Sequence, residues 1–310
     1  MLSRVAEQLY WFGRHIERAE NSARLVAVNA NLMLDLPRPF QRIWANVIDI
    51  SGSNDLFYPS YGKADEDCVL QFMLSDETNP SSMLCCVRMA RDNARSSREI
   101  LPPEAWETIN ELYLYVRDNA VLGTDPGERL GYLQRVIRYC QQVTGMLFGS
   151  MGHGSAYSFK RIGRNLERAD MSTRIIDVGC VNLLPGGGDD SATAYAELLW
   201  LNILNSLGSY QIYRQHVKVR PYGEDVVEFL FKYVDAPRSV LHCLEEIRTC
   251  LLRLPGNEAP LQTLELARNR VKAADIAQLL EQDNLHGFID EVQLGLGNIH
   301  AQVERVWFRY

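Results

Sequence analysis

No stretch of the 310-residue sequence is a long, uninterrupted hydrophobic run. Because a helix needs about 20 consecutive apolar residues to cross a bilayer, the sequence predicts no membrane-spanning segment. Near the amino terminus, Glu7 stands where a signal peptide would carry its apolar region. We therefore expect a cytoplasmic protein that is neither secreted nor embedded in a membrane.

Basic residues are also fewer than acidic residues in this sequence. The formal net charge is -7 and the sequence pI is about 5.5. Binding of nucleic acid without sequence preference depends on a broad basic surface. We therefore expect no nucleic-acid partner.

The cysteines do not form the pattern of a metal site or of a disulfide framework. No two of them stand in a Cys-x-x-Cys pair, and their odd number fits a reduced compartment. Free cysteine behaves mainly as a small hydrophobe, so we expect buried thiols, including the adjacent Cys85 and Cys86. The seven positions are Cys68, Cys85, Cys86, Cys140, Cys180, Cys243 and Cys250.

Three further patterns are absent. The sequence has no sustained period-two alternation bounded by hairpin turn pairs, so little sheet is expected. The glycine-rich stretch 185–190 lacks the Lys-Ser/Thr ending of a phosphate-binding loop and is predicted to be a flexible connector. None of the six histidines follows a glutamate by three residues, which argues against a ferritin-like di-metal bundle. The sequence predicts no metal and no cofactor.

Helical periodicity is what the sequence does contain. From Leu2 to Met33 apolar residues recur in alternating steps of three and four, which predicts one long core-facing helix. Proline should stop this helix at 36–39. Further breaks are predicted at 79–80, 102–103, 123–127, 184–188, 220–223, 236–237 and 254–256. The fold class is therefore all-α, a large helical bundle forming a single domain over residues 1–310.

An internal repeat of one helix is the most informative feature. Residues 13–26 match residues 163–176 at an offset of 150, with seven identities in fourteen positions. The identical positions in the first copy are Gly13, Arg14, Glu17, Arg18, Ala19, Ser22 and Arg24. We expect two related halves, about 1–150 and 151–310, that carry equivalent motif helices.

Each motif helix carries a glycine and two acids beside its core stripe. A glycine inside a helix costs about 0.5–1 kcal/mol relative to alanine. Gly13 and Gly163 therefore predict the close approach of another helix or of a ligand. The acids that border the core are Glu17, Glu20, Glu167 and Asp170.

A third segment predicts a ladder of arginines. An apolar stripe from Met83 to Leu101 predicts a helix, and four arginines run one step beside it. Arginines at that spacing repel each other unless carboxylates or bound anions lie nearby. The acids of the motif helices are the natural candidates. The ladder consists of Arg88, Arg91, Arg95 and Arg98.

Two interpretations of these charges stay open. Arginines and acids could form a structural ion-pair network, as they do in many helical bundles. Alternatively, ten arginines against four acids leave a surplus, and guanidinium groups suit phosphate or carboxylate. The candidate anion-binding residues are Arg14, Arg18, Arg88, Arg91, Arg95, Arg164 and Arg168, with Glu17, Glu20, Glu167 and Asp170 as the paired carboxylates.

At these motifs the chain resembles the alpha-E superfamily, a bacterial all-helical family named for its Glu-Arg motif. The resemblance rests on residues 1–4 with 10–20, 91–99, 162–171 and 236–240, and so spans most of the chain. It implies a role beside an ATP-grasp ligase-like protein and a transglutaminase-like protein in a peptide-forming or peptide-modifying system. It implies no catalytic residue set.

Two functions are therefore weighed. The first is a helical partner or scaffold of that system, with an arginine-rich cleft for an anionic peptide or phosphate. The second is an enzyme or ligand-delivering subunit that acts on an anionic peptide, an acyl-phosphate or a nucleotide. The second function requires that four arginines point into one common site: Arg91, Arg95, Arg164 and Arg168.

Overall fold

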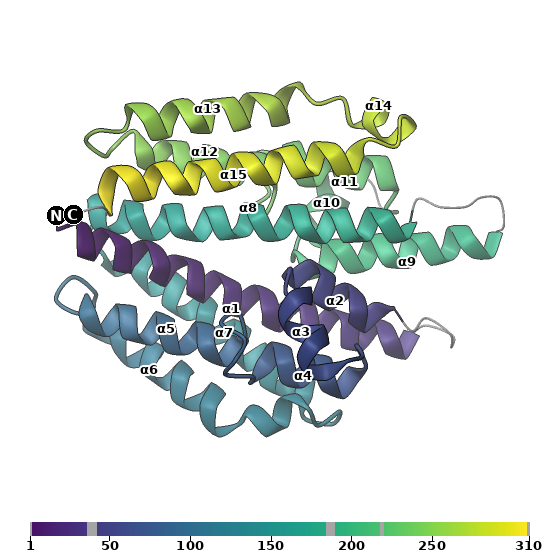
Figure 1. The fold of residues 1–310 in the computed structure, drawn as a ribbon, viewed down its shortest axis with the longest axis horizontal. Coiled ribbons are helices and arrows are strands. Elements are labelled where there is room, and N and C mark those ends of the chain that lie inside the picture. Colours follow the sequence, from purple (N-terminus) through teal and green to yellow (C-terminus); the bar gives the residue numbers. More distant parts are fainter. Residues whose placement is uncertain (1, 36–41, 184–189, 218–219, 309–310) are drawn as a thin grey trace. The chain divides into compact units, whose positions relative to one another are not determined.

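The computed structural model describes residues 2–35, 42–183, 190–217 and 220–308, and every regular element in these ranges is helical (Figure 1). This confirms the all-α prediction. The chain divides into two compact units, residues 1–164 (unit 1) and 165–310 (unit 2). The division falls within helix α8 (Ser155–Leu183).

Unit 1 is built around the first motif helix, α1 (Ser3–Asp35). Helix α1 packs against α5 (Met83–Ser96) and α7 (Arg129–Ser150), and both of these contact α6 (Pro103–Asp118). The four helices thus form a closed ring of contacts. Shorter elements complete the unit: α2 (Ile43–Ser51), α3 (Asn54–Tyr61), α4 (Glu66–Leu74) and the 3-10 helix η1 (Ala120–Gly123).

The apolar stripe predicted for α1 is confirmed in its central part and wrong at its ends. Leu9, Phe12 and Val26 are buried, whereas Leu2 is 77% exposed and Met33 is 38% exposed. Helix α1 ends at Asp35. The proline stop predicted for 36–39 lies outside the described residues.

Most other predicted breaks coincide with helix boundaries. Helix α6 begins at Pro103, and α11 (Gly223–Lys232) begins at the glycine of the 220–223 break. Other boundaries were missed, among them those between α7 and α8 and between α9 and α10. Two of the missed boundaries lie at Gly52 and Gly62, which end α2 and α3 with φ angles of 65° and 73°. Glycine adopts this left-handed conformation without steric cost. The predicted connector at 185–190 lies, apart from its last residue, outside the described residues.

Unit 2 contains the remaining part of α8 and a second set of packed helices. Helix α12 (Val240–Leu251) contacts α11 and α13 (Glu258–Ala273), and α13 contacts α15 (Leu285–Trp307) along its length (Figure 1). The other elements are α9 (Asp190–Ser206), α10 (Tyr210–His216) and α14 (Ile276–Glu281).

Two further sequence expectations can be compared with the structure. All seven cysteines are free thiols; six are buried and Cys68 is partly exposed. The buried-thiol prediction is thus confirmed for six of the seven. No helix in the described ranges has both the length and the apolar character needed to cross a membrane.

Candidate functional site

The two glycines of the repeat lie where α1 and the first turns of α8 meet backbone to backbone. A Cβ atom added to Gly13 would overlap the carbonyl oxygen of Lys160, and one added to Gly163 would overlap the carbonyl oxygen of Tyr10. The contact is reciprocal, because 160 = 10 + 150 and 163 = 13 + 150 in the numbering of the repeat. The predicted close approach is therefore confirmed, and a helix makes it.

The glutamate of the first motif forms a buried ion pair with the first arginine of the second. The Arg164 Nε donates a hydrogen bond to Glu17 Oε2 at 2.9 Å, and the exposed fractions of the two side chains are 22% and 1%. The bond links residues 147 positions apart and fastens α1 to the start of α8. These two candidate site residues thus contribute to the framework of the fold.

The buried thiol of Cys140, on α7, is affected by the negative charges of the glutamates on α1. Burial raises the pKa of Cys140 well above its usual range, and the charges of Glu20 and Glu17 raise it further. Because the thiolate is the reactive form of cysteine, Cys140 is a poor nucleophile at neutral pH. The Cys140 side chain packs in the core of unit 1.

The second acid of each motif pairs within its own helix. Glu20 accepts from Arg24 at 2.9 Å, and Asp170 accepts from Arg174 at 3.1 Å. Both are contacts between residues four positions apart, at equivalent places in the repeat. They support the structural interpretation of these charges.

The second arginine of each motif reaches the loop before a neighbouring helix. In unit 1 the Arg18 Nη1 lies 3.4 Å from Ser81 Oγ, just before α5. In unit 2 the Arg168 Nη1 donates to the carbonyl oxygen of Pro237 at 3.4 Å, just before α12. Ser172 strengthens the second contact by donating to the carbonyl oxygen of Arg238 at 2.8 Å. Each motif helix therefore positions the start of another helix.

These two loops form a second repeat that the sequence analysis missed. The pattern Pro-x-Ser-x-Leu-x-Cys occurs at residues 80–86 and again at 237–243. In both copies the serine caps the helix, accepting from Cys85 N at 3.3 Å and from His242 N at 3.1 Å. In both copies the cysteine thiol points to the proline carbonyl oxygen, at 3.9 and 3.6 Å. The offset of 157, rather than 150, concealed the match.

Loss of either capping serine should destabilise the protein measurably. We expect Ser239→Ala to lower the free energy of unfolding by about 1–2 kcal/mol and Ser82→Ala by about 1 kcal/mol. The larger effect is expected at Ser239, because its hydroxyl also donates to the Tyr233 carbonyl oxygen at 2.6 Å. Urea denaturation measures both. Ser53→Ala is the matched control, since Ser53 precedes α3 without capping it; an equal loss there would contradict the capping argument.

Three arginines of the ladder lie on α5, but the helix ends at Ser96 rather than at Leu101, so Arg98 lies beyond it. The partners of the ladder also differ from those expected. Arg88 pairs with Glu77 at 2.7 Å, and Arg95 pairs with Asp92 at 3.3 Å. Arg91 donates to Asn110 Oδ1 of α6 at 2.7 Å and lies over the rings of Trp106 and Tyr113. Arg98 is exposed. The expectation that Glu17 and Glu20 neutralise the ladder was wrong, because local acids and aromatic rings of α6 take that place.

Arg14 and Glu167 are the two remaining residues of the predicted set of anion-binding arginines and paired carboxylates. The Arg14 guanidinium lies 5.5 Å from the Trp11 ring centroid, on its own helix. Glu167, in unit 2, is 2% exposed. Within unit 1, the candidate arginines Arg14, Arg88, Arg91 and Arg95 thus contact different groups. Their role in anion binding stays a prediction.

A groove between α6 and α7 gathers arginines that the sequence analysis did not select. Its volume is about 440 Å³, and its lining, the α6–α7 groove, consists of Glu111, Arg135, Arg138, Tyr139 and Gln142. The Arg135 guanidinium lies 4.7 Å from the Tyr115 ring centroid and 5.8 Å from that of Tyr139. Helix α7 has three arginines and no acid between residues 129 and 150, a signal that could have pointed to this site.

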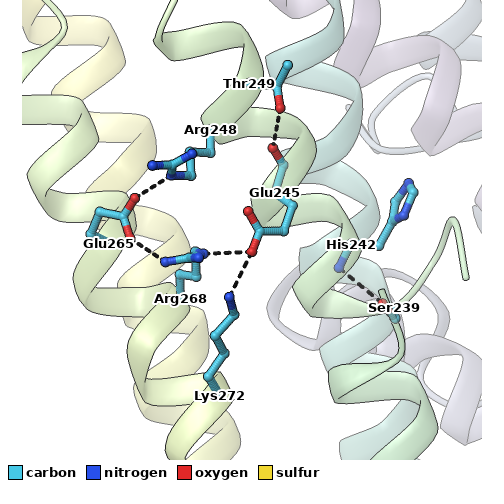
Figure 2. Close-up of polar contacts among 8 residues, drawn as sticks. All are labelled: Ser239, His242, Glu245, Arg248, Thr249, Glu265, Arg268 and Lys272. Atoms are coloured by element: carbon cyan, nitrogen blue, oxygen red, sulfur yellow. Dashed lines mark hydrogen bonds and ion pairs between the residues drawn. The ribbon is translucent and has the colours of Figure 1, made fainter. Parts of the chain in front are cut away.

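A charged cluster of unit 2 joins α12 to α13, and Figure 2 shows its arrangement. Glu245 accepts from Arg268 and Lys272 at 2.7 and 3.0 Å. Glu265 accepts from Arg248 and Arg268, both at 2.6 Å. Burial opposes ionisation of Glu245, but these hydrogen bonds outweigh it and hold its pKa below the usual range. These ion pairs connect α12 to α13, as the hydrogen bond between Arg91 and Asn110 connects α5 to α6.

A histidine links α15 to α8 within unit 2. His286 Nδ1 lies 2.7 Å from Asp177 Oδ1, and its Nε2 lies 3.7 Å from Asp290 Oδ2. The hydrogen bond to Asp177 and the charge of that carboxylate raise the pKa of His286 above 6.5. The charged imidazolium is therefore the form that the fold favours.

Stability should consequently fall as the pH rises through the raised pKa of His286. The contribution is complete below the pKa of the unfolded chain, near 6.5, and disappears above that of the folded state. Because the side chain is 63% exposed, we expect less than about 1 kcal/mol. Thermal melts at several pH values measure it. Asp177→Asn should flatten this part of the profile, and an unchanged profile would contradict the assignment.

The chain is similar over nearly its whole length to a known protein family and to proteins of two mycobacteria. A family model described as a predicted alpha-helical domain with a conserved ER motif matches residues 1–308. An uncharacterized protein of Mycobacterium bovis and one of Mycobacterium tuberculosis are each 24% identical over 328 residues, covering 98% of this chain. The match covers 36% of each relative, so the chain spans about a third of their length. No solved structure gave a significant match.

Proposed function

This chain belongs to the Alpha-E family, and from that membership we propose that it is a helical partner or scaffold of a peptide-forming or peptide-modifying system. Its partners in this proposal are an ATP-grasp ligase-like protein and a transglutaminase-like protein, and its location is the cytoplasm. These partners are the ones that the family resemblance at the Glu-Arg motifs implies.

The Glu17–Arg164 ion pair is the observation that carries the proposal. If the motif were a reacting site, its charged groups would be directed toward a substrate. Instead, Glu17 is 1% exposed and is bonded to the other motif helix, and Arg168 reaches the backbone of the loop before α12. A motif that builds the framework is what a binding or scaffold protein requires.

The length of the relatives is compatible with a binding function. In the mycobacterial proteins the matched region is 36% of the chain, so it operates beside a large amount of additional polypeptide. A domain that lies beside further polypeptide in its relatives is in a setting that suits a binding function.

Affinity purification of the tagged chain from its native host, followed by mass spectrometry, tests the proposal. We expect an ATP-grasp or transglutaminase-like protein to be enriched over an unrelated helical protein with the same tag. Recovery of the chain alone, repeatedly and at native concentration, would oppose the scaffold function.

The α6–α7 groove favours a second candidate, an enzyme or ligand-delivering subunit that holds an anionic peptide, acyl-phosphate or nucleotide. Its arginines could bind such a group through paired donors. Thermal melts with ATP, phosphate and acidic peptide would test it. A ligand at a hundred times its Kd stabilises the folded state by about 2.7 kcal/mol. If no anion shifts the melt, this candidate fails.

A further inference from the structure

We propose that the α6–α7 groove is the docking site for an acidic peptide segment of a partner protein, with a carboxylate held by Arg135 and Arg138. This inference deepens the proposed binding function and rests on it. The groove is outside the repeated motifs, and no residue of it takes part in the ion pairs described above.

The charge of the groove is the first argument. Arg135 and Arg138 line it together, and neither has a carboxylate partner in the part of the chain that the structure describes. By contrast, Arg88 and Arg95 on the neighbouring helix α5 are each paired with an acid. The groove therefore holds two guanidinium groups against one carboxylate, that of Glu111, and this local excess of positive charge is complementary to a negatively charged segment.

Preorganisation is the second argument. Arg135 is held over the rings of Tyr115 and Tyr139. Its guanidinium therefore loses less conformational freedom when it binds than that of an unrestrained surface arginine. Arg138 follows three residues later, so the two side chains project from the same face of α7.

The remaining lining favours a peptide over a phosphate. Gln142 can both donate to and accept from a peptide backbone, and Tyr139 offers an aromatic surface. Glu111 would repel a multiply charged phosphate more strongly than a single carboxylate, and it can accept from a peptide N–H. A volume of about 440 Å³ has room for several side chains.

Fluorescence anisotropy with a labelled glutamate-rich peptide tests the proposal, with ATP and inorganic phosphate as unlabelled competitors. We expect Arg138→Gln to weaken peptide binding about tenfold, because one charge-assisted contact is lost. Glu111→Gln should strengthen it severalfold, an effect of opposite sign that damage to the fold would not produce. Arg95→Gln removes the same charge from α5 and should leave binding unchanged.

Several results would overturn the groove assignment. The first is that Arg138→Gln binds the peptide as tightly as the original chain does, and the second is that Arg95→Gln loses as much affinity as Arg138→Gln. The third is that phosphate or ATP displaces the peptide at lower concentration than unlabelled peptide does.

Failure of the scaffold function would be a separate result. If Arg138→Gln captures the ATP-grasp or transglutaminase-like protein as well as the original chain does, the groove inference fails and the scaffold function stands. If neither protein is captured, the scaffold function fails whatever the peptide does.

Discussion

Gly163→Ala should unfold the protein or lower its free energy of unfolding by about 3 kcal/mol or more. The new Cβ would overlap the carbonyl oxygen of Tyr10, which is backbone and cannot rotate away. Relief requires α1 and α8 to separate, with the loss of close packing on both. Gly13→Ala should behave alike, because its Cβ would overlap the carbonyl oxygen of Lys160. Urea denaturation and circular dichroism measure the effect.

Helix α7 offers a matched control for this experiment. Gly145 has nothing within 4 Å of the position that a Cβ would occupy. Gly145→Ala should therefore stabilise the protein by about 0.5–1 kcal/mol through helix propensity alone. If Gly163→Ala were as stable as Gly145→Ala, the close contact of the motif helices would be refuted.

Glu17→Ala should destabilise the protein by about 3 kcal/mol. Removing the carboxylate leaves the Arg164 guanidinium without this partner, and breaking a buried pair costs about 3–5 kcal/mol. The lower end is expected because Arg164 is 22% exposed and water compensates part of the loss. Denaturation curves of Glu17→Ala, Arg164→Met and the double variant give the coupling energy.

The exposed pair of Arg88 and Glu77 provides the comparison. Its side chains are 39% and 67% exposed, so Glu77→Ala should cost at most about 1 kcal/mol. The double variant of Glu17 and Arg164 should be more stable than the sum of the single losses predicts. Strict additivity would show that the two side chains do not interact in solution.

The sequence predicted those parts of the fold that depend on local pattern. The repeat located both motif helices and their glycines, because the same residue types recur 150 positions apart. A helical glycine alone would not have indicated a close neighbour, since Gly145 of α7 has none. The stripe of α1 failed at Leu2 and Met33, since periodicity identifies a face but not how far along the helix other elements cover it.

The candidate site was harder to predict, for two physical reasons. The partners of an arginine depend on tertiary contacts: Arg91 meets Asn110 and two aromatic rings of α6, which no spacing within α5 reveals. The α6–α7 groove is likewise assembled from two helices, so the excess of basic residues on α7 did not reveal that Arg135 and Arg138 share a groove with Glu111 of α6.

The contacts of Gly13 with Lys160 and of Gly163 with Tyr10 have the symmetry of an interface between two identical partners. Residues 10 and 13 face residues 160 and 163, their counterparts in the repeat. An interface in which residue i meets j and j meets i is the isologous interface of a two-fold symmetric dimer. The two motif helices therefore meet as two copies of one helix would meet across such an interface, although both belong to one polypeptide. His15 and Asn165 differ at equivalent positions of the two motifs, whereas both motifs carry a glycine where the contact leaves no room for a Cβ atom.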